Sequence, residues 1–103
     1  MSKYKAIPTV VDGISFASKK EAHRYSELRM LEKAGIIAHL KLQPKFPILV
    51  AGKLVCTYIA DFQYIDQMKR IVVEDVKGMK TPVYRLKKKL VEASYPQLRI
   101  TEL

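Results

Sequence analysis

The chain has 103 residues, which is enough for one compact domain and too few for a second independent one. Hydrophobic residues make up 49% and charged residues 28% of it, a balance that excludes a disordered chain and fits a globular protein with a modest core. The 19 Lys and Arg residues outnumber the 10 Asp and Glu residues, and the resulting formal charge of +9 favours a polyanionic partner such as nucleic acid.

Several protein classes are excluded by what the sequence lacks. Cys56 is the single cysteine, so neither an intramolecular disulfide nor a thiolate-rich metal cluster is expected, and a reducing cytosol fits. The sequence has no signal-peptide pattern and no apolar run of about 18 residues, so we expect a cytoplasmic protein without a membrane partner. The sequence has neither a Gly-rich phosphate loop nor a Ser/His/Asp order, so nucleotide hydrolases and acyl-transfer enzymes are excluded as function classes. No organic cofactor is expected.

The first predicted elements are a hairpin and a helix. Asp12-Gly13 lies between short β-prone stretches, which indicates a tight hairpin or an extended N-terminal arm within residues 1–16. Ser18-Lys19-Lys20-Glu21 then matches the S-x-x-E capping box, and apolar residues recur at helical spacing until Ala34-Gly35 ends the pattern. We therefore expect a helix between Ser18 and Ala34.

Strands are predicted through the middle of the chain. Pro44 and Pro47 restrict the first stretch to edge-like or bulged geometry, Ala51-Gly52-Lys53 indicates a turn, and Ile71-Val72-Val73 suits a central strand. The three stretches should pair as an antiparallel meander, and they cover residues 36–50, 54–64 and 70–77.

A second helix and a last strand complete the expected fold. Thr81-Pro82 supplies an N-cap and a proline at the first helical position, and the helix should run to about Ser94 before Tyr95-Pro96 ends it. Its apolar stripe is expected to consist of Val83, Leu86, Leu90 and Ala93. Residues 98–103 can form a strand, so the order α-β-β-β-α-β predicts an α/β (α+β) domain over residues 1–103 with one mixed sheet flanked by helices.

The acidic residues of the predicted strands carry the chemistry. Because a strand alternates its faces, Asp75 and Lys77 should point to one side and Glu74 to the other. Asp61 is a single acid in an apolar stretch that should pair with the Asp75 strand, so the two carboxylates are expected to be neighbours. Adjacent carboxylates repel each other, and a divalent cation would relieve that repulsion while acting as a Lewis acid. The alternative is a structural ion pair between Asp75 and Lys77.

These residues resemble the PD-(D/E)XK nuclease superfamily, which includes restriction enzymes and several Holliday-junction resolvases. Asp61 followed by Asp75-x-Lys77 supplies the pattern, with Ala60 in place of the proline and with aspartate at the D/E position. The chain is also similar to a family of short phage and prophage endonucleases, through the motifs Asp12-Gly13-Ile14-x-Phe16-x-Ser18-Lys19-x-Glu21-Ala22, Gln43-Pro44-x-Phe46, Tyr58-x-Ala60-Asp61-Phe62 and Glu74-Asp75-Val76-Lys77-Gly78.

The resemblance implies a restriction-endonuclease-like core and an Mg²⁺- or Mn²⁺-dependent endodeoxyribonuclease. Its implied catalytic residues are Glu21, Asp61, Asp75 and Lys77, of which the three acids would hold the metal and the lysine would act on the attacking water or the charged phosphate. The implied substrate is branched or structured DNA in phage replication or recombination, inside the bacterial host. A cut in two strands would require a homodimer, for which the N-terminal stretch could supply a swapped arm.

Other polar residues have weaker assignments. The candidates for DNA contacts are Lys80, Arg85, Lys87 and Lys88, and the alternative is a solvated basic face. Gln43 is either a site residue or a hydrogen bonder at a strand bulge. His23 and His39 lack metal-ligand spacing and are expected to be ordinary surface or packing residues. Five tyrosines are expected to be half-buried core aromatics rather than base-stacking platforms: Tyr25, Tyr58, Tyr64, Tyr84 and Tyr95.

Two questions stay open from the sequence. Glu21 is either a capping-box residue or a catalytic acid that tilts toward the sheet. The whole chain could also be a non-catalytic nucleic-acid-binding module, or a phage structural or interaction protein in which Asp75 and Lys77 form only an ion pair.

Overall fold

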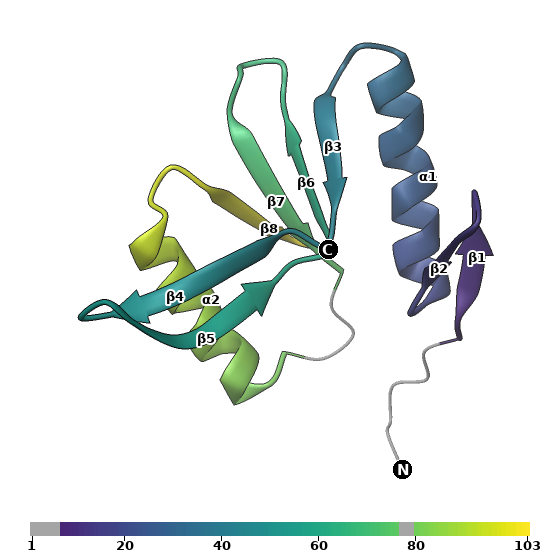
Figure 1. The fold of residues 1–103 in the computed structure, drawn as a ribbon. Coiled ribbons are helices and arrows are strands. Elements are labelled where there is room, and N and C mark those ends of the chain that lie inside the picture. Colours follow the sequence, from purple (N-terminus) through teal and green to yellow (C-terminus); the bar gives the residue numbers. More distant parts are fainter. Residues whose placement is uncertain (1–6, 77–79) are drawn as a thin grey trace.

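The computed structural model describes residues 7–76 and 80–103, and within them it contains two helices and eight strands (Figure 1). In chain order these elements are β1 (Thr9–Val11), β2 (Ile14–Phe16), α1 (Lys19–Lys33), β3 (Ala38–Leu42), β4 (Lys45–Val50), β5 (Lys53–Ile59), β6 (Phe62–Ile65), β7 (Ile71–Asp75), α2 (Pro82–Ser94) and β8 (Arg99–Glu102). No helix in the described part of the chain is long and apolar enough to cross a membrane. The α+β class with a mixed sheet and two helices is confirmed.

The N-terminal stretch is a hairpin that packs on its own helix. Asp12 and Gly13 have φ angles of 53° and 74°, which a two-residue type I′ turn between β1 and β2 requires. The Tyr25 ring of α1 lies 4.9 Å from the ring of Phe16, and its hydroxyl donates a 3.0 Å hydrogen bond to Asp12. The hairpin interpretation of this stretch is therefore confirmed.

Helix α1 begins and ends where the sequence predicts. Ser18 is the N-cap, and its Oγ accepts a 3.1 Å hydrogen bond from the backbone N–H of Glu21. The helix ends at Lys33, and Gly35 follows with a φ of 77°.

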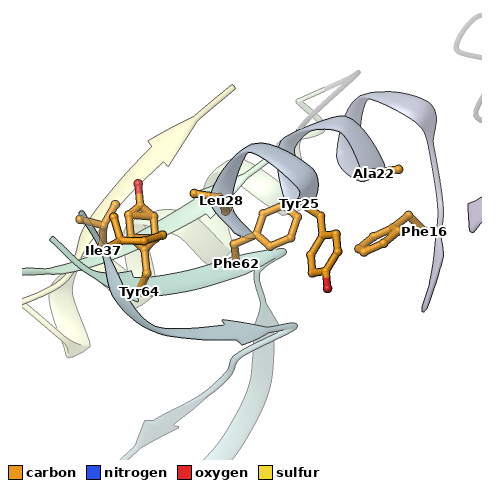
Figure 2. Close-up of a cluster of buried hydrophobic side chains, with 8 residues drawn as sticks. Phe16, Ala22, Tyr25, Leu28, Ile37, Phe62 and Tyr64 are labelled. Atoms are coloured by element: carbon orange, nitrogen blue, oxygen red, sulfur yellow. The ribbon is translucent and has the colours of Figure 1, made fainter. Parts of the chain in front are cut away.

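The main sheet has the strand order β3-β6-β7-β8, and both of its faces are covered. Strand β6 is antiparallel to both β3 and β7, whereas β8 runs parallel to β7, so the predicted mixed sheet is present. On one face α1 packs Leu28 and Tyr25 against a cluster that includes Phe62 and Val72 (Figure 2). On the other face Val73 packs against side chains of α2 and the β4–β5 hairpin. Successive β7 residues thus point to opposite layers.

Two predicted strands are each divided between two sheets, so the single meander was wrong. The 36–50 stretch breaks at Gln43-Pro44 into β3 and β4, and the 54–64 stretch breaks at Ala60-Asp61 into β5 and β6. The two breaks are tied to each other, because Gln43 N donates to Asp61 O at 2.9 Å and Ala60 N donates to Pro44 O at 3.1 Å. Gln43 has a left-handed φ of 51°, which turns the chain from one sheet into the other. The hairpin β4–β5 therefore leaves the main sheet and covers α2.

Of the apolar stripe predicted for α2, only Leu90 packs against the core, and Val83, Leu86 and Ala93 are exposed. Val83 and Leu86 are 64% and 59% exposed, whereas Tyr84 and Val91 are buried, with Leu90 partly buried beside them. Tyr84 turns inward because its ring packs near Tyr58 and its hydroxyl has a carboxylate partner, Glu102, at 2.7 Å. Tyr84, whose hydroxyl is hydrogen-bonded, therefore occupies the buried face of α2, and Val83 and Leu86 face the solvent.

Candidate site at the end of the mixed sheet

Strand β7 ends in two consecutive buried carboxylates that face different layers. Glu74 is 1% exposed and Asp75 is 0% exposed, which is unusual for acidic residues. Glu74 lies on the α1 side of the sheet, and Asp75 lies on the side covered by α2 and β4–β5. The predicted separation of the two side chains is confirmed, and each carboxylate has a different set of partners.

Both oxygens of Asp75 are held by donors from the β5–β6 segment. The hydroxyl of Tyr58 donates to Oδ2, and the backbone N–H of Asp61 donates to Oδ1 at 3.2 Å. Hydrogen bonds to the ionised form stabilise a buried carboxylate against its desolvation. The orientation of Asp75 is therefore fixed by residues that precede β6.

Asp61 lies next to Asp75, as predicted, although it stands at the β5–β6 break rather than inside a strand. Its Oδ2 accepts a 2.7 Å hydrogen bond from the backbone N–H of Val76, the residue after Asp75, while the backbone N–H of Asp61 itself donates to Asp75. Asp61 is half-buried and is the solvent-facing member of the pair. The break in the strand is what turns Asp61 toward the end of β7.

Glu21 lies at the same end of the molecule and has a confirmed capping role for its backbone. Arg24, one turn further along α1, reaches Glu74, and Lys20, the residue before Glu21, lines a hollow together with Val76, which follows β7. Its side chain is buried on the helix face that packs on the sheet, together with Tyr25 and Leu28. Among residues 7–76 and 80–103, no group of three or more His, Cys, Asp or Glu residues is arranged to hold a metal ion. Of the predicted acids, Asp61 and Asp75 are tied together by hydrogen bonds within the described residues.

The Glu74 cluster was missed by sequence reasoning. Arg24 Nε and Nη2 donate to the two Glu74 oxygens at 2.7 and 2.6 Å, and the hydroxyl of Tyr64 donates to the same carboxylate. The bonds with Glu74 hold the pKa of Arg24 above its ordinary value, and burial followed by the bond to Glu74 raises the pKa of Tyr64. The contact between Arg24 and Glu74 is therefore bidentate and charge-assisted, and the Tyr64 hydroxyl adds a third donor to the same carboxylate.

The predicted DNA-contacting cations have different surroundings. Lys80 and Lys88 lie 3.3 and 3.6 Å from Glu102, so both have an acidic partner within the chain. The hydrogen bond from Tyr84, followed by these lysines, holds the pKa of Glu102 below its usual value. Arg85 is exposed, and Lys87 lines a hollow of about 280 Å³ beside Tyr58. Lys87 shares this hollow with Tyr58, whose hydroxyl bonds to Asp75.

The remaining predicted residues are resolved as follows. Lys77 lies outside the described residues, so its role stays a prediction. Gln43 contributes its backbone N–H at the strand break, and its side chain is exposed. His23 and His39 are exposed, as expected. Tyr58 was expected only as a core aromatic, and its place three residues before Asp61 was the signal that could have linked it to the site.

The fold and the site define a small, basic α+β protein with paired aspartates at the end of a mixed sheet. The chain belongs to the family described as Protein of unknown function (DUF1064), whose family model matches residues 1–103. No curated protein and no solved structure matches the chain. The family description names no activity, so the arrangement of the side chains is what supports a function.

Proposed function

We propose that the protein is a metal-dependent DNA endonuclease with a restriction-endonuclease-like core of the PD-(D/E)XK type. The observation that carries this proposal is the hydrogen-bonded pair formed by Asp61 and Asp75 at the end of a central strand. Such a pair concentrates negative charge in a chain whose formal charge is +9. In this proposal Lys77, two residues after Asp75, orients or deprotonates the attacking water or stabilises the charged phosphate.

The donor set fits Mg²⁺ or Mn²⁺. Carboxylate oxygens are hard ligands, and Mg²⁺ is commonly bound by one or two carboxylates, several waters and substrate phosphates rather than by a complete protein cage. Asp61 and Asp75 would hold the cation, with Glu21 as a third acid near the same end of the sheet. When bound, the cation supplies a Lewis acid for phosphodiester hydrolysis.

The proposed substrate is branched or structured DNA, in phage replication or recombination within the bacterial cytoplasm. One site of this size cuts one strand at a time, so paired cuts would require a homodimer. The basic chain would approach the phosphate backbone with little sequence preference, because phosphate contacts carry no sequence information directly.

A non-catalytic nucleic-acid-binding module is the second candidate. It is favoured by the fact that both oxygens of Asp75 already accept hydrogen bonds from the protein, as a purely structural carboxylate would. This candidate predicts DNA binding with the same basic surface but no cleavage that depends on a divalent cation.

The deciding experiment incubates the purified protein with linear, single-stranded, flapped and four-way-junction DNAs, each with Mg²⁺, Mn²⁺ or EDTA. We expect cleavage with either cation, strongest on the branched substrates, and none with EDTA. Binding to these DNAs without cleavage under any condition would replace the nuclease by the binding module.

We predict that Glu21→Gln keeps the free energy of unfolding within about 1 kcal/mol of the parent but lowers the cleavage rate by about tenfold or more. Glutamine serves at the third position of a capping box, whereas a neutral amide is a poor ligand for a hard cation. Melting curves and Mn²⁺-dependent nicking rates of one preparation check both parts. The matched variant is Ser18→Ala, which removes the cap acceptor and should lose stability while keeping activity; parental nicking by Glu21→Gln would leave Glu21 as a cap alone.

We predict that Lys87→Ala weakens binding to all DNA sequences alike and lowers the slope of log affinity against log salt by about one. The reason is that one phosphate contact releases about one counterion. Lys88 is less suitable for this test because it also contacts Glu102. The control is Lys69→Ala in the β6–β7 turn, at the opposite end of the sheet, which should leave the slope unchanged; equal slopes for both variants would remove Lys87 from the DNA surface (Figure 1).

A further inference from the structure

Tyr58 is a buried β5 residue with a polar group aimed at the aspartate pair. It is 2% exposed, and its ring lies 6.2 Å from the ring of Phe46 and 6.3 Å from that of Tyr84. Its hydroxyl donates to Oδ2 of Asp75, which lies 17 residues away in the sequence. The aromatic packing fixes the ring, so the hydroxyl has a defined position.

The hydrogen bond from Tyr58 complements the one from Asp61. Oδ1 of Asp75 accepts from the Asp61 backbone at 3.2 Å, while Oδ2 accepts from Tyr58, so the two donors hold the two ends of the carboxylate. Because Asp75 is 0% exposed, its orientation is set by groups of the protein rather than by water. The Tyr58 hydroxyl sets the direction of Oδ2.

We propose that Tyr58 is a positioning residue for a divalent-cation site, and that its hydroxyl keeps the Asp75 carboxylate correctly turned for binding the cation. The inference rests on the proposed function, because it assigns Asp75 to metal binding. Residues that hydrogen-bond to metal-binding carboxylates orient them, and changing such residues typically lowers metal affinity or activity by about 10- to 100-fold.

Tyr64 provides a matched control on the opposite face of β7. Tyr64 also donates its hydroxyl to a buried β7 carboxylate, that of Glu74, which faces α1. Tyr58→Phe and Tyr64→Phe each remove one oxygen from a buried ring that bonds to a carboxylate. Their effects on folding should therefore be similar, whereas their effects on a cation at Asp75 should differ.

The experiment measures free Mn²⁺ by electron paramagnetic resonance in titrations of the parent, Tyr58→Phe, Tyr64→Phe and Asp75→Asn proteins without DNA. We expect Tyr58→Phe to weaken Mn²⁺ binding by about 10-fold or more, Tyr64→Phe to bind within about twofold of the parent, and Asp75→Asn to lose the site. Parental affinity in Tyr58→Phe, with the site lost in Asp75→Asn, overturns the role of Tyr58 and leaves the proposed function standing. A parent that binds no Mn²⁺ overturns both.

A second measurement keeps the test decisive if Tyr58→Phe does not fold. The parent protein is labelled with ¹³C at tyrosine Cζ and titrated with Mg²⁺. We expect the Tyr58 resonance to move as the cation withdraws charge from Asp75, and the Tyr64 resonance to stay in place. A Tyr58 resonance that stays fixed while Mg²⁺ binds contradicts the proposal.

Discussion

Asp75→Asn is expected to lower DNA cleavage by roughly a thousandfold or more, the loss that follows when several kcal/mol of transition-state stabilisation by a metal are removed. The amide oxygen can still accept a hydrogen bond from Tyr58 or Asp61, so the packing around position 75 should be retained. A neutral amide is nevertheless a poor partner for a divalent cation. DNA affinity should stay within about tenfold of the parent, because phosphate binding is spread over many cations.

The control for this variant is Asp66→Asn, which changes an aspartate in the β6–β7 turn at the other end of the sheet. Asp66 bonds to Arg70 and to backbone N–H groups of its own turn, so its replacement should cost some stability and leave cleavage unchanged. Nicking rates under single-turnover conditions and DNA affinities in EDTA check the two variants. Parental cleavage by Asp75→Asn would remove the proposed site.

Arg24→Ala is expected to lower the free energy of unfolding by about 3 to 5 kcal/mol, because it leaves Glu74 buried without its cation. Glu74 is 1% exposed, so water cannot replace the two bonds that Arg24 donates. Urea unfolding measured by circular dichroism checks the value. In the Arg24→Ala background, Glu74→Gln should recover part of the loss, since a neutral amide is cheaper to bury than a carboxylate.

The matched control on the same helix is Arg29→Ala, which breaks a partly exposed pair with Glu32, three residues away. Such pairs contribute about 0 to 1 kcal/mol, so this variant should lose far less stability than Arg24→Ala. Equal losses would show that Glu74 is stabilised without Arg24.

The helices, the hairpin and the alternation of β7 could be predicted from local sequence. The Ser18 cap, the Asp12-Gly13 turn and the opposite directions of Glu74 and Asp75 follow from rules that act within a few residues. The neighbouring positions of Asp61 and Asp75 followed from strand pairing. These elements place the candidate site at the end of the sheet.

The strand breaks and the Arg24–Glu74 pair could not be predicted in this way. β-propensity is continuous through residues 54–64, and whether a strand stays in one sheet depends on partners that are distant in the sequence. Arg24 and Glu74 are 50 residues apart, and nothing near either residue indicates the other. The inward turn of Tyr84 likewise depends on Glu102, on a strand that follows its helix.

The alternation of the two acids along β7 also constrains how the strand can pair while the chain folds. A slip of one residue would move Glu74 to the face of Tyr58 and Asp75 to the face of Arg24, because every side chain of a slipped strand changes face. The shorter Asp75 side chain would reach less far toward the guanidinium, and a buried charge without a well-placed partner is strongly unfavourable. A misaligned β7 is therefore destabilised on both faces of the sheet at once. The two neighbouring carboxylates thus favour the native register of the central strand.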